Sequence, residues 1–152
     1  MLYFIVVITA FFQATVINSI AVANIRPDAL LILVVFAALH KDMLNAVGIG
    51  LLAGLLKDIL SVGPFINTLT FAFCAFCVSF FAGRFYRQSR IAELLIVAAA
   101  SCIVTAVYLF WFSRWPVPPP VFMLIMRVGI PALFYTVLAS PLEFFILKKI
   151  LD

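Results

Sequence analysis

Several charged residues lie within long apolar segments of the sequence, where an ionised side chain is costly. Lys57 and Asp58 come near the end of one such segment, and Arg127 lies inside another. A charge at the centre of a membrane helix costs about 2.5–3.5 kcal/mol on insertion scales, so such groups usually have a partner. We predict that Asp58 and Arg127 form an intramembrane ion pair, directly or through Asn67. We favour a structural pair over a proton or ion site, because a relay needs a chain of titratable groups.

A second candidate for chemistry is the Cys74-x-x-Cys77 spacing, which occurs in metal and redox sites. A metal would need further ligands, and a redox pair would need access to water. The single histidine, His40, belongs to a loop, so we interpret the two cysteines as buried small side chains. The sequence also contains no H-E-x-x-H motif, no nucleophile elbow and no paired carboxylates at one depth. We therefore expect no catalytic residue, no metal and no cofactor, and we predict that the protein is not an enzyme.

The composition predicts that these residues are carried by helices in a membrane. Of the 152 residues, 67% are hydrophobic and 11% are charged, whereas soluble proteins average roughly 45–50% and about 25%. A single small core cannot bury this excess, so lipid must solvate much of the chain. The net charge of +4 comes from basic residues at the ends of apolar segments, which argues against nucleic acid as a partner. We expect an integral membrane protein whose residues 1–152 form a single transmembrane domain.

The predicted fold class is all-α, with six transmembrane helices. The six apolar segments that we assign to them are residues 2–23, 29–39, 43–60, 65–83, 91–112 and 121–147. The first segment lacks a preceding basic region and exceeds the length of a signal-peptide core, so we predict an uncleaved helix. The second segment is too short to span about 30 Å of hydrocarbon at 1.5 Å per residue. We expect it either to thin the bilayer or to be shielded by its neighbours.

The distribution of basic residues predicts that both termini are cytoplasmic. With six crossings, the basic residues on the cytoplasmic side are Lys41, Arg84, Arg87, Arg90, Lys148 and Lys149. Those on the outer side are Arg26, Lys57, Arg114 and Arg127. This bias follows the positive-inside rule. The alternative is that the second and third segments together form a hairpin that enters and leaves the membrane on one side. The other loops would then lie on the same sides of the membrane as with six crossings.

Small residues on the third segment predict close helix packing. Gly50 and Gly54 form a G-x-x-x-G pair, and Gly48 lies nearby. Without side chains, two helix backbones can approach closely and are then held by dispersion. The pair can serve as a contact face for a partner's helix or as a packing site within the chain, and we favour the second interpretation.

Aromatic and proline residues mark the last two segments. Tyr108, Trp111 and Trp115 cluster where the fifth helix is expected to leave the membrane, which is typical of an interfacial aromatic belt. Pro131 and Pro141 lie inside the sixth segment, where each removes a backbone hydrogen bond. We expect the sixth helix to be kinked at these positions.

The ordered set of residues in the first half of the chain resembles one known family. Arg26-Pro27-Asp28 opens the short apolar helix, and the set continues with Gly50, Gly54, Asp58-Ile59, Gly63 and Asn67. In this order and spacing, they resemble the MreD family of bacterial rod shape-determining membrane proteins. The resemblance covers roughly the whole chain. It marks Pro27, Asp28, Gly50, Gly54, Asp58, Gly63 and Asn67 as family-pattern residues with structural or interfacial roles.

The resemblance implies a non-enzymatic scaffold of the cell-elongation and peptidoglycan-synthesis complex in the bacterial inner membrane. The implied partners are MreC, whose single helix anchors an outer domain, the actin-like MreB, the glycosyltransferase RodA and a class B penicillin-binding transpeptidase. The family is also similar in fold to the substrate-binding subunits of energy-coupling-factor transporters.

That second likeness provides the alternative function, a small-molecule-binding membrane subunit of an energy-coupling-factor-type transporter. Such subunits dock through small residues on their first helix, and Ala10-x-x-x-Ala14 is a partial match. A ligand pocket also needs convergent polar groups. On the outer side these are few, mainly Asn67, Thr68 and Thr70. We therefore favour the scaffold over the binder.

Overall fold

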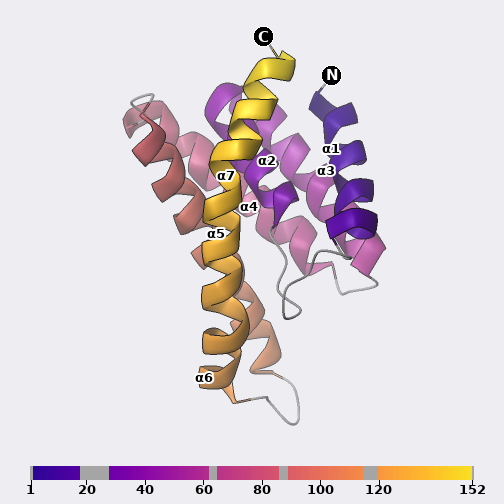
Figure 1. The fold of residues 1–152 in the computed structure, drawn as a ribbon, viewed down its shortest axis with the longest axis vertical. Helices are drawn as coiled ribbons and strands as arrows, with labels where there is room; N and C mark the ends of the chain where they lie inside the picture. Colours follow the sequence, from indigo (N-terminus) through magenta and orange to yellow (C-terminus); the bar gives the residue numbers. More distant parts are fainter. Residues whose placement is uncertain (1, 18–27, 62–64, 86–88, 115–119, 152) are drawn as a thin grey trace.

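A computed structural model describes residues 2–17, 28–61, 65–85, 89–114 and 120–151, and within these ranges the protein is helical without strands (Figure 1). The predicted all-α class is confirmed. The elements are α1 (Leu2–Phe12), the π-helical segment η1 (Gln13–Ile17), α2 (Ala29–His40), α3 (Met43–Ser61), α4 (Ile66–Phe85), α5 (Arg90–Phe112), α6 (Val121–Leu124), the π-helical segment η2 (Ile125–Gly129) and α7 (Ile130–Leu151). The family-pattern residues Pro27 and Gly63 and the belt residue Trp115 lie outside the described residues.

The short helix α2 forms the centre of the molecule. Every residue from 30 to 38 is buried, and α2 contacts α1, α3, α4, α5 and α7 (Figure 1). A helix that is apolar on all sides must be surrounded by other elements. Its 12 residues rise only about 18 Å. Of the two expectations for this segment, shielding by neighbouring helices is the one that the structure shows.

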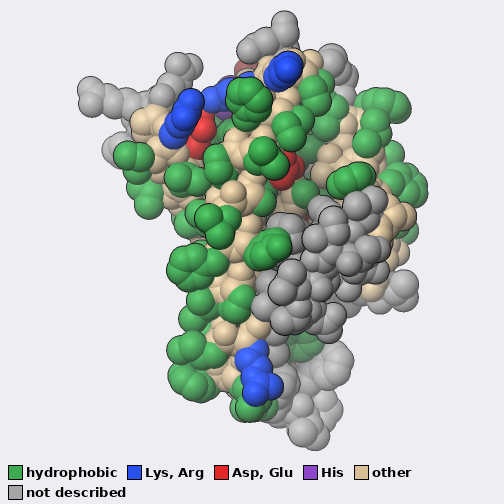
Figure 2. All heavy atoms as spheres, viewed as in Figure 1, with side chains coloured by type: hydrophobic (Ala, Val, Ile, Leu, Met, Phe, Trp, Pro, Cys, Tyr) green, Lys and Arg blue, Asp and Glu red, His purple; other side chains and the backbone are tan. Residues whose placement is uncertain are grey.

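The surrounding helices provide the surface that faces lipid. Three are long and apolar enough to cross a membrane: Met43–Ser61, Arg90–Phe112 and Ile125–Ile150. Three apolar helices are shorter in the part of the chain that the structure describes: Leu2–Thr15, Ala29–His40 and Ile66–Ala82. Large hydrophobic side chains such as Phe4, Leu69 and Leu138 point outward and are at least 70% exposed. Figure 2 shows hydrophobic side chains spread along the described part of the visible face.

The two ends of the described chain lie at the same end of the molecule. α1 begins and α7 finishes there, while α6 lies at the opposite end (Figure 1). An even number of passes through the bundle is required for this arrangement.

The two prolines of the last segment are accommodated differently. The π-helical segment η2 lies directly before Pro131, whose missing N–H would have bonded the carbonyl of Arg127 in a regular helix. Pro141 lies inside α7 and likewise leaves the carbonyl of Val137 without its usual donor. The Ser140 hydroxyl donates a hydrogen bond of 2.8 Å to that carbonyl. A neighbouring side chain therefore supplies the bond that the proline removes.

Candidate functional site

The start of α2 is held by side chains from three other helical elements. Asp28 caps the helix, because its Oδ1 accepts a hydrogen bond of 3.3 Å from the Leu31 amide. The Leu30 amide donates to Gln13 Oε1 at 3.1 Å, and the Asp28 amide donates to Thr136 Oγ1 at 3.3 Å. The first amides of a helix have no partner within it, and a carboxylate beside them is favoured by the helix dipole. A helix that begins inside the bundle is thereby supplied with acceptors.

Lys57 of α3 forms an ion pair with Asp28. Its ammonium group donates to Asp28 Oδ2 and lies 4.8 Å from the centre of the Phe71 ring. The two side chains are only 20% and 16% exposed. A pair shielded in this way is screened much less than a surface pair. Lys57 was expected to need a partner, and the structure identifies Asp28 as that partner.

Asp58, the next residue along α3, caps a different helix. Its side chain is 2% exposed and receives four hydrogen bonds from the first turn of α4. The Asn67 amide and side-chain Nδ2 donate to Oδ1 at 3.2 and 2.7 Å. The Thr68 amide and hydroxyl donate to Oδ2 at 2.8 and 2.7 Å. The start of α4 therefore stabilises this buried charge without a cation.

The predicted ion pair between Asp58 and Arg127 is not formed. Arg127 lies in η2 with an exposed side chain. Among the described residues, salt bridges join Lys57 to Asp28 and Lys148 to Glu93, and none joins Asp58 to Arg127. The reason is that Asp58 already has four donors in α4. Asn67, which the prediction placed between the two charges, does bind Asp58, but Arg127 is not part of this network.

Asn67 extends this polar network to α5. The Tyr108 hydroxyl donates a hydrogen bond to Asn67 Oδ1, so Asn67 joins Asp58 on α3 to Tyr108 on α5. The Tyr108 hydroxyl is therefore directed into the bundle. Trp111 of the predicted aromatic belt is 43% exposed.

The glycines of α3 are located at contacts within the chain. A Cβ on Gly50 would lie 2.7 Å from the Phe71 carbonyl oxygen of α4, and a Cβ on Gly54 would lie 2.5 Å from the Asn67 carbonyl oxygen. A Cβ on Gly48 would lie 3.1 Å from the Tyr3 hydroxyl of α1. The structure thus places Gly50 and Gly54 against α4 and Gly48 against α1, so these positions are occupied by neighbouring helices of the same chain.

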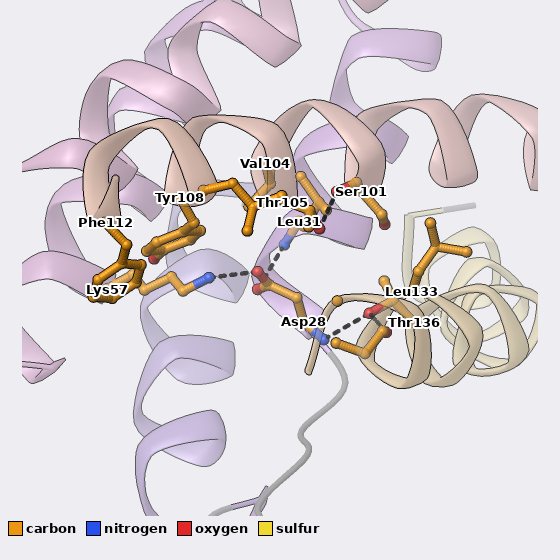
Figure 3. A pocket seen from close by; sticks show the side chains of 13 residues that line it. Asp28, Leu31, Lys57, Ser101, Val104, Thr105, Tyr108, Phe112, Leu133 and Thr136 are labelled. Carbon is orange, nitrogen blue, oxygen red and sulfur yellow. Dashed lines mark hydrogen bonds and ion pairs between the residues drawn. The ribbon is translucent and has the colours of Figure 1, made fainter. Parts of the chain in front are cut away.

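A cavity of about 430 Å³ opens beside the Asp28–Lys57 pair (Figure 3). Its walls come from α2, α3, α5, η2 and α7, and they are mostly apolar. The polar side chains that reach it are those of Asp28, Lys57, Ser101, Thr105, Tyr108 and Thr136. The Ser101 side-chain oxygen is buried and has no hydrogen-bond partner among the residues that the structure describes. The volume lies within the range of small-molecule sites, about 300–1,000 Å³.

Three residues around Asp28 and the cavity were not predicted from the sequence: Gln13, Ser101 and Thr136. Gln13 carries a signal, because a side-chain amide is unusual within an apolar segment and must find a partner there. Ser101 and Thr136 carry no such signal, since a small hydroxyl can bond a carbonyl of its own helix. Thr136 does so with Ala132 and also accepts from Asp28, which lies 108 residues away in the sequence.

The two cysteines considered as a chemical site lie on α4. Cys74 is buried and Cys77 is half-buried. The described ranges of the chain contain no group of three or more His, Cys, Asp or Glu side chains arranged to hold a metal ion.

A second cavity, of about 600 Å³, is a groove between α4 and α5. It is lined almost entirely by apolar groups, several of them small: Cys77, Ala82, Ala92, Ala99 and Ala100. Ala99 is exposed. Grooves of small side chains allow the backbone of another transmembrane helix to approach closely.

Comparison with known proteins gives one match. The family model for the rod shape-determining protein MreD matches residues 1–148. No curated protein and no solved structure matches the chain.

Proposed function

This chain belongs to the MreD family of rod shape-determining membrane proteins, and from that membership we propose that it is a non-enzymatic scaffold of the bacterial cell-elongation machinery. In this role it crosses the inner membrane six times with both termini in the cytoplasm, and it binds MreC. Through MreC and its own cytoplasmic loops it is linked to MreB, RodA and a class B penicillin-binding transpeptidase. The common location of the first and last helix ends supports an even number of crossings (Figure 1).

The groove between α4 and α5 is the observation that carries the scaffold proposal. The small residues of α3 are covered by α4, so the G-x-x-x-G face is not available to a partner. The groove, by contrast, combines small side chains with an apolar surface that includes the exposed Ala99. In the absence of a hydrophobic driving force within lipid, such close packing is what holds helices together. We therefore assign the anchor helix of MreC to this groove.

Substitution of Ala99 by leucine tests the assignment. The larger side chain would project into the groove, and overpacking of an interface by about 1.4 kcal/mol weakens binding about tenfold. Ala98→Leu is the matched control, because Ala98 is the neighbouring alanine on α5 and does not line the groove. The measurement is the amount of MreC that co-purifies with the tagged protein from membranes in mild detergent. Equal recovery of MreC with the two variants would remove the groove from the interface, and no recovery with the unsubstituted protein would refute the scaffold.

A second candidate function, small-molecule binding, is supported by the cavity beside Asp28 and Lys57. A buried hydroxyl without a partner costs about 1–3 kcal/mol, and Ser101 has its side-chain oxygen in this situation at the cavity wall. A ligand with an apolar body and a hydrogen-bonding group would satisfy Ser101 and fill the space. Such a ligand is the kind of cargo expected of an energy-coupling-factor-type subunit.

Ala132→Leu, which projects into this cavity, distinguishes the two functions. For a binder, mass spectrometry of solvent extracts should detect a small molecule with the unsubstituted protein and with Ala99→Leu, but not with Ala132→Leu. For a scaffold alone, the three extracts should be the same, and MreC recovery should respond to Ala99→Leu only.

A further inference from the structure

A third cavity lies between the first turn of α5 and the last turns of α7, at the end of the molecule that carries both chain ends. Its volume is about 550 Å³. Arg90 and Glu93 contribute from α5, and Lys148 contributes from α7. Figure 2 shows basic side chains gathered at this end, over the start of α5 and the end of α7. The cavity is separate from both sites described above, because it shares no lining residue with either.

The charge at the rim of this cavity favours an anion. Arg90 is exposed, and Lys148 is bonded to Glu93 at 3.0 Å with its side chain still 47% exposed. Two cations therefore face one carboxylate. An ammonium group has three donors, so Lys148 can bind Glu93 and an incoming oxygen together. Ser89 caps α5 at the same rim, and the positive end of that helix dipole adds to the attraction.

The floor of the cavity is apolar, whereas its rim is charged. Below the cations it is formed by apolar groups, among them Leu94, Pro141 and Phe144. Leu142 and Phe145, which are 68% and 67% exposed, continue this apolar surface outward along α7. A small inorganic anion makes no use of such a surface. A molecule with an anionic head and a hydrocarbon tail matches both parts of the cavity.

The depth of the cavity identifies the source of that molecule. Arg90 is the first residue of a membrane-spanning helix, and Lys148 lies near the end of another. Both cations thus lie where the hydrocarbon ends and lipid headgroups begin. Basic pockets between transmembrane helices at this level bind anionic headgroups. We propose that this cavity binds an anionic phospholipid, with its phosphate between Arg90 and Lys148 and an acyl chain along Leu142 and Phe145.

The test is native mass spectrometry of the protein in micelles that contain equal amounts of phosphatidylglycerol and phosphatidylcholine with the same acyl chains. The unsubstituted protein should retain phosphatidylglycerol preferentially. Arg90→Gln should reduce that retention about fivefold, the usual effect of one basic residue beside anionic lipid. Lys149→Gln is the matched control, because Lys149 is an exposed neighbour of Lys148 that does not line the cavity. It should retain the lipid as the unsubstituted protein does.

Substitution of Lys148 also affects its ion pair with Glu93, so two variants of Lys148 separate lipid binding from folding. Lys148→Arg preserves the charge and should retain the lipid, whereas Lys148→Gln should lose it. Three results would overturn the proposal. The first is equal retention of the two lipids by the unsubstituted protein. The second is an equal loss with Lys149→Gln and Arg90→Gln, which would indicate a general surface charge. The third is displacement of the lipid by millimolar inorganic phosphate, which would indicate a site for a free anion.

Discussion

Replacing Gly54 with alanine is expected to lower the free energy of unfolding by about 3 kcal/mol, at the upper end of overpacking effects. The added Cβ would lie 2.5 Å from both the Asn67 carbonyl oxygen and the Thr68 Cα of α4. Both are backbone atoms, so no side-chain rotation can relieve the contact, and α3 and α4 must move apart. That movement would also lengthen the hydrogen bonds that Asp58 receives from the same turn of α4.

The matched control is Gly48→Ala on the same helix. Its Cβ would approach only the hydroxyl of Tyr3, at 3.1 Å, and this is the far end of a side chain that can turn. Alanine is also the better helix former, by about 1 kcal/mol. We expect the free energy of unfolding of Gly48→Ala to differ from that of the unsubstituted protein by at most about 1 kcal/mol. The measurement is unfolding of the purified proteins by increasing mole fractions of sodium dodecyl sulphate in mixed micelles. Equal midpoints for the two variants would show that α3 and α4 are not in the close contact described.

Replacing Asp58 with alanine is the second large effect, an expected loss of at least about 3 kcal/mol in the free energy of unfolding, because each buried donor left without an acceptor costs about 1–3 kcal/mol. Four donors at the start of α4 would lose their acceptor, and two of them are backbone amides that α4 itself cannot satisfy. Asp58→Asn preserves the shape but turns an amide group toward donors, so it should restore only part of the loss.

Asp42→Ala provides the control for the loss of a carboxylate. Asp42 is exposed at the other end of α3, where water can replace any lost bond, so we expect a change of at most about 1 kcal/mol. The same unfolding assay compares the three variants. A loss of stability with Asp42→Ala as large as that with Asp58→Ala would contradict the capping role of Asp58.

A double substitution separates this capping role from the ion pair that the sequence suggested. If Asp58 paired with Arg127, exchanging the two charges would recover part of the stability lost in each single variant. Asp58 is bound to Asn67 and Thr68, and Arg127 is exposed. We therefore expect Asp58→Arg to lower the free energy of unfolding equally with and without Arg127→Asp.

Much of the architecture could be predicted from composition and local pattern. The positions of the helices follow from the apolar segments, and the shortness of α2 follows from the 12 residues between Asp28 and Lys41. The close packing of α3 follows from the spacing of Gly50 and Gly54. Each of these is a local property, because the cost of exposing apolar groups or of crowding two backbones depends on residue types and helical spacing.

The partners of the charged and polar side chains were decided by tertiary structure alone. Sequence position estimates how deep Lys57, Asp58 and Tyr108 lie, but not which helix each one faces, since that depends on helix order and rotation. Asp58 therefore turned out to bind the free amides of α4, and Lys57 to bind the residue that caps α2. In lipid the backbone donors and acceptors must be satisfied within the protein, and only the assembled bundle determines which groups are within reach.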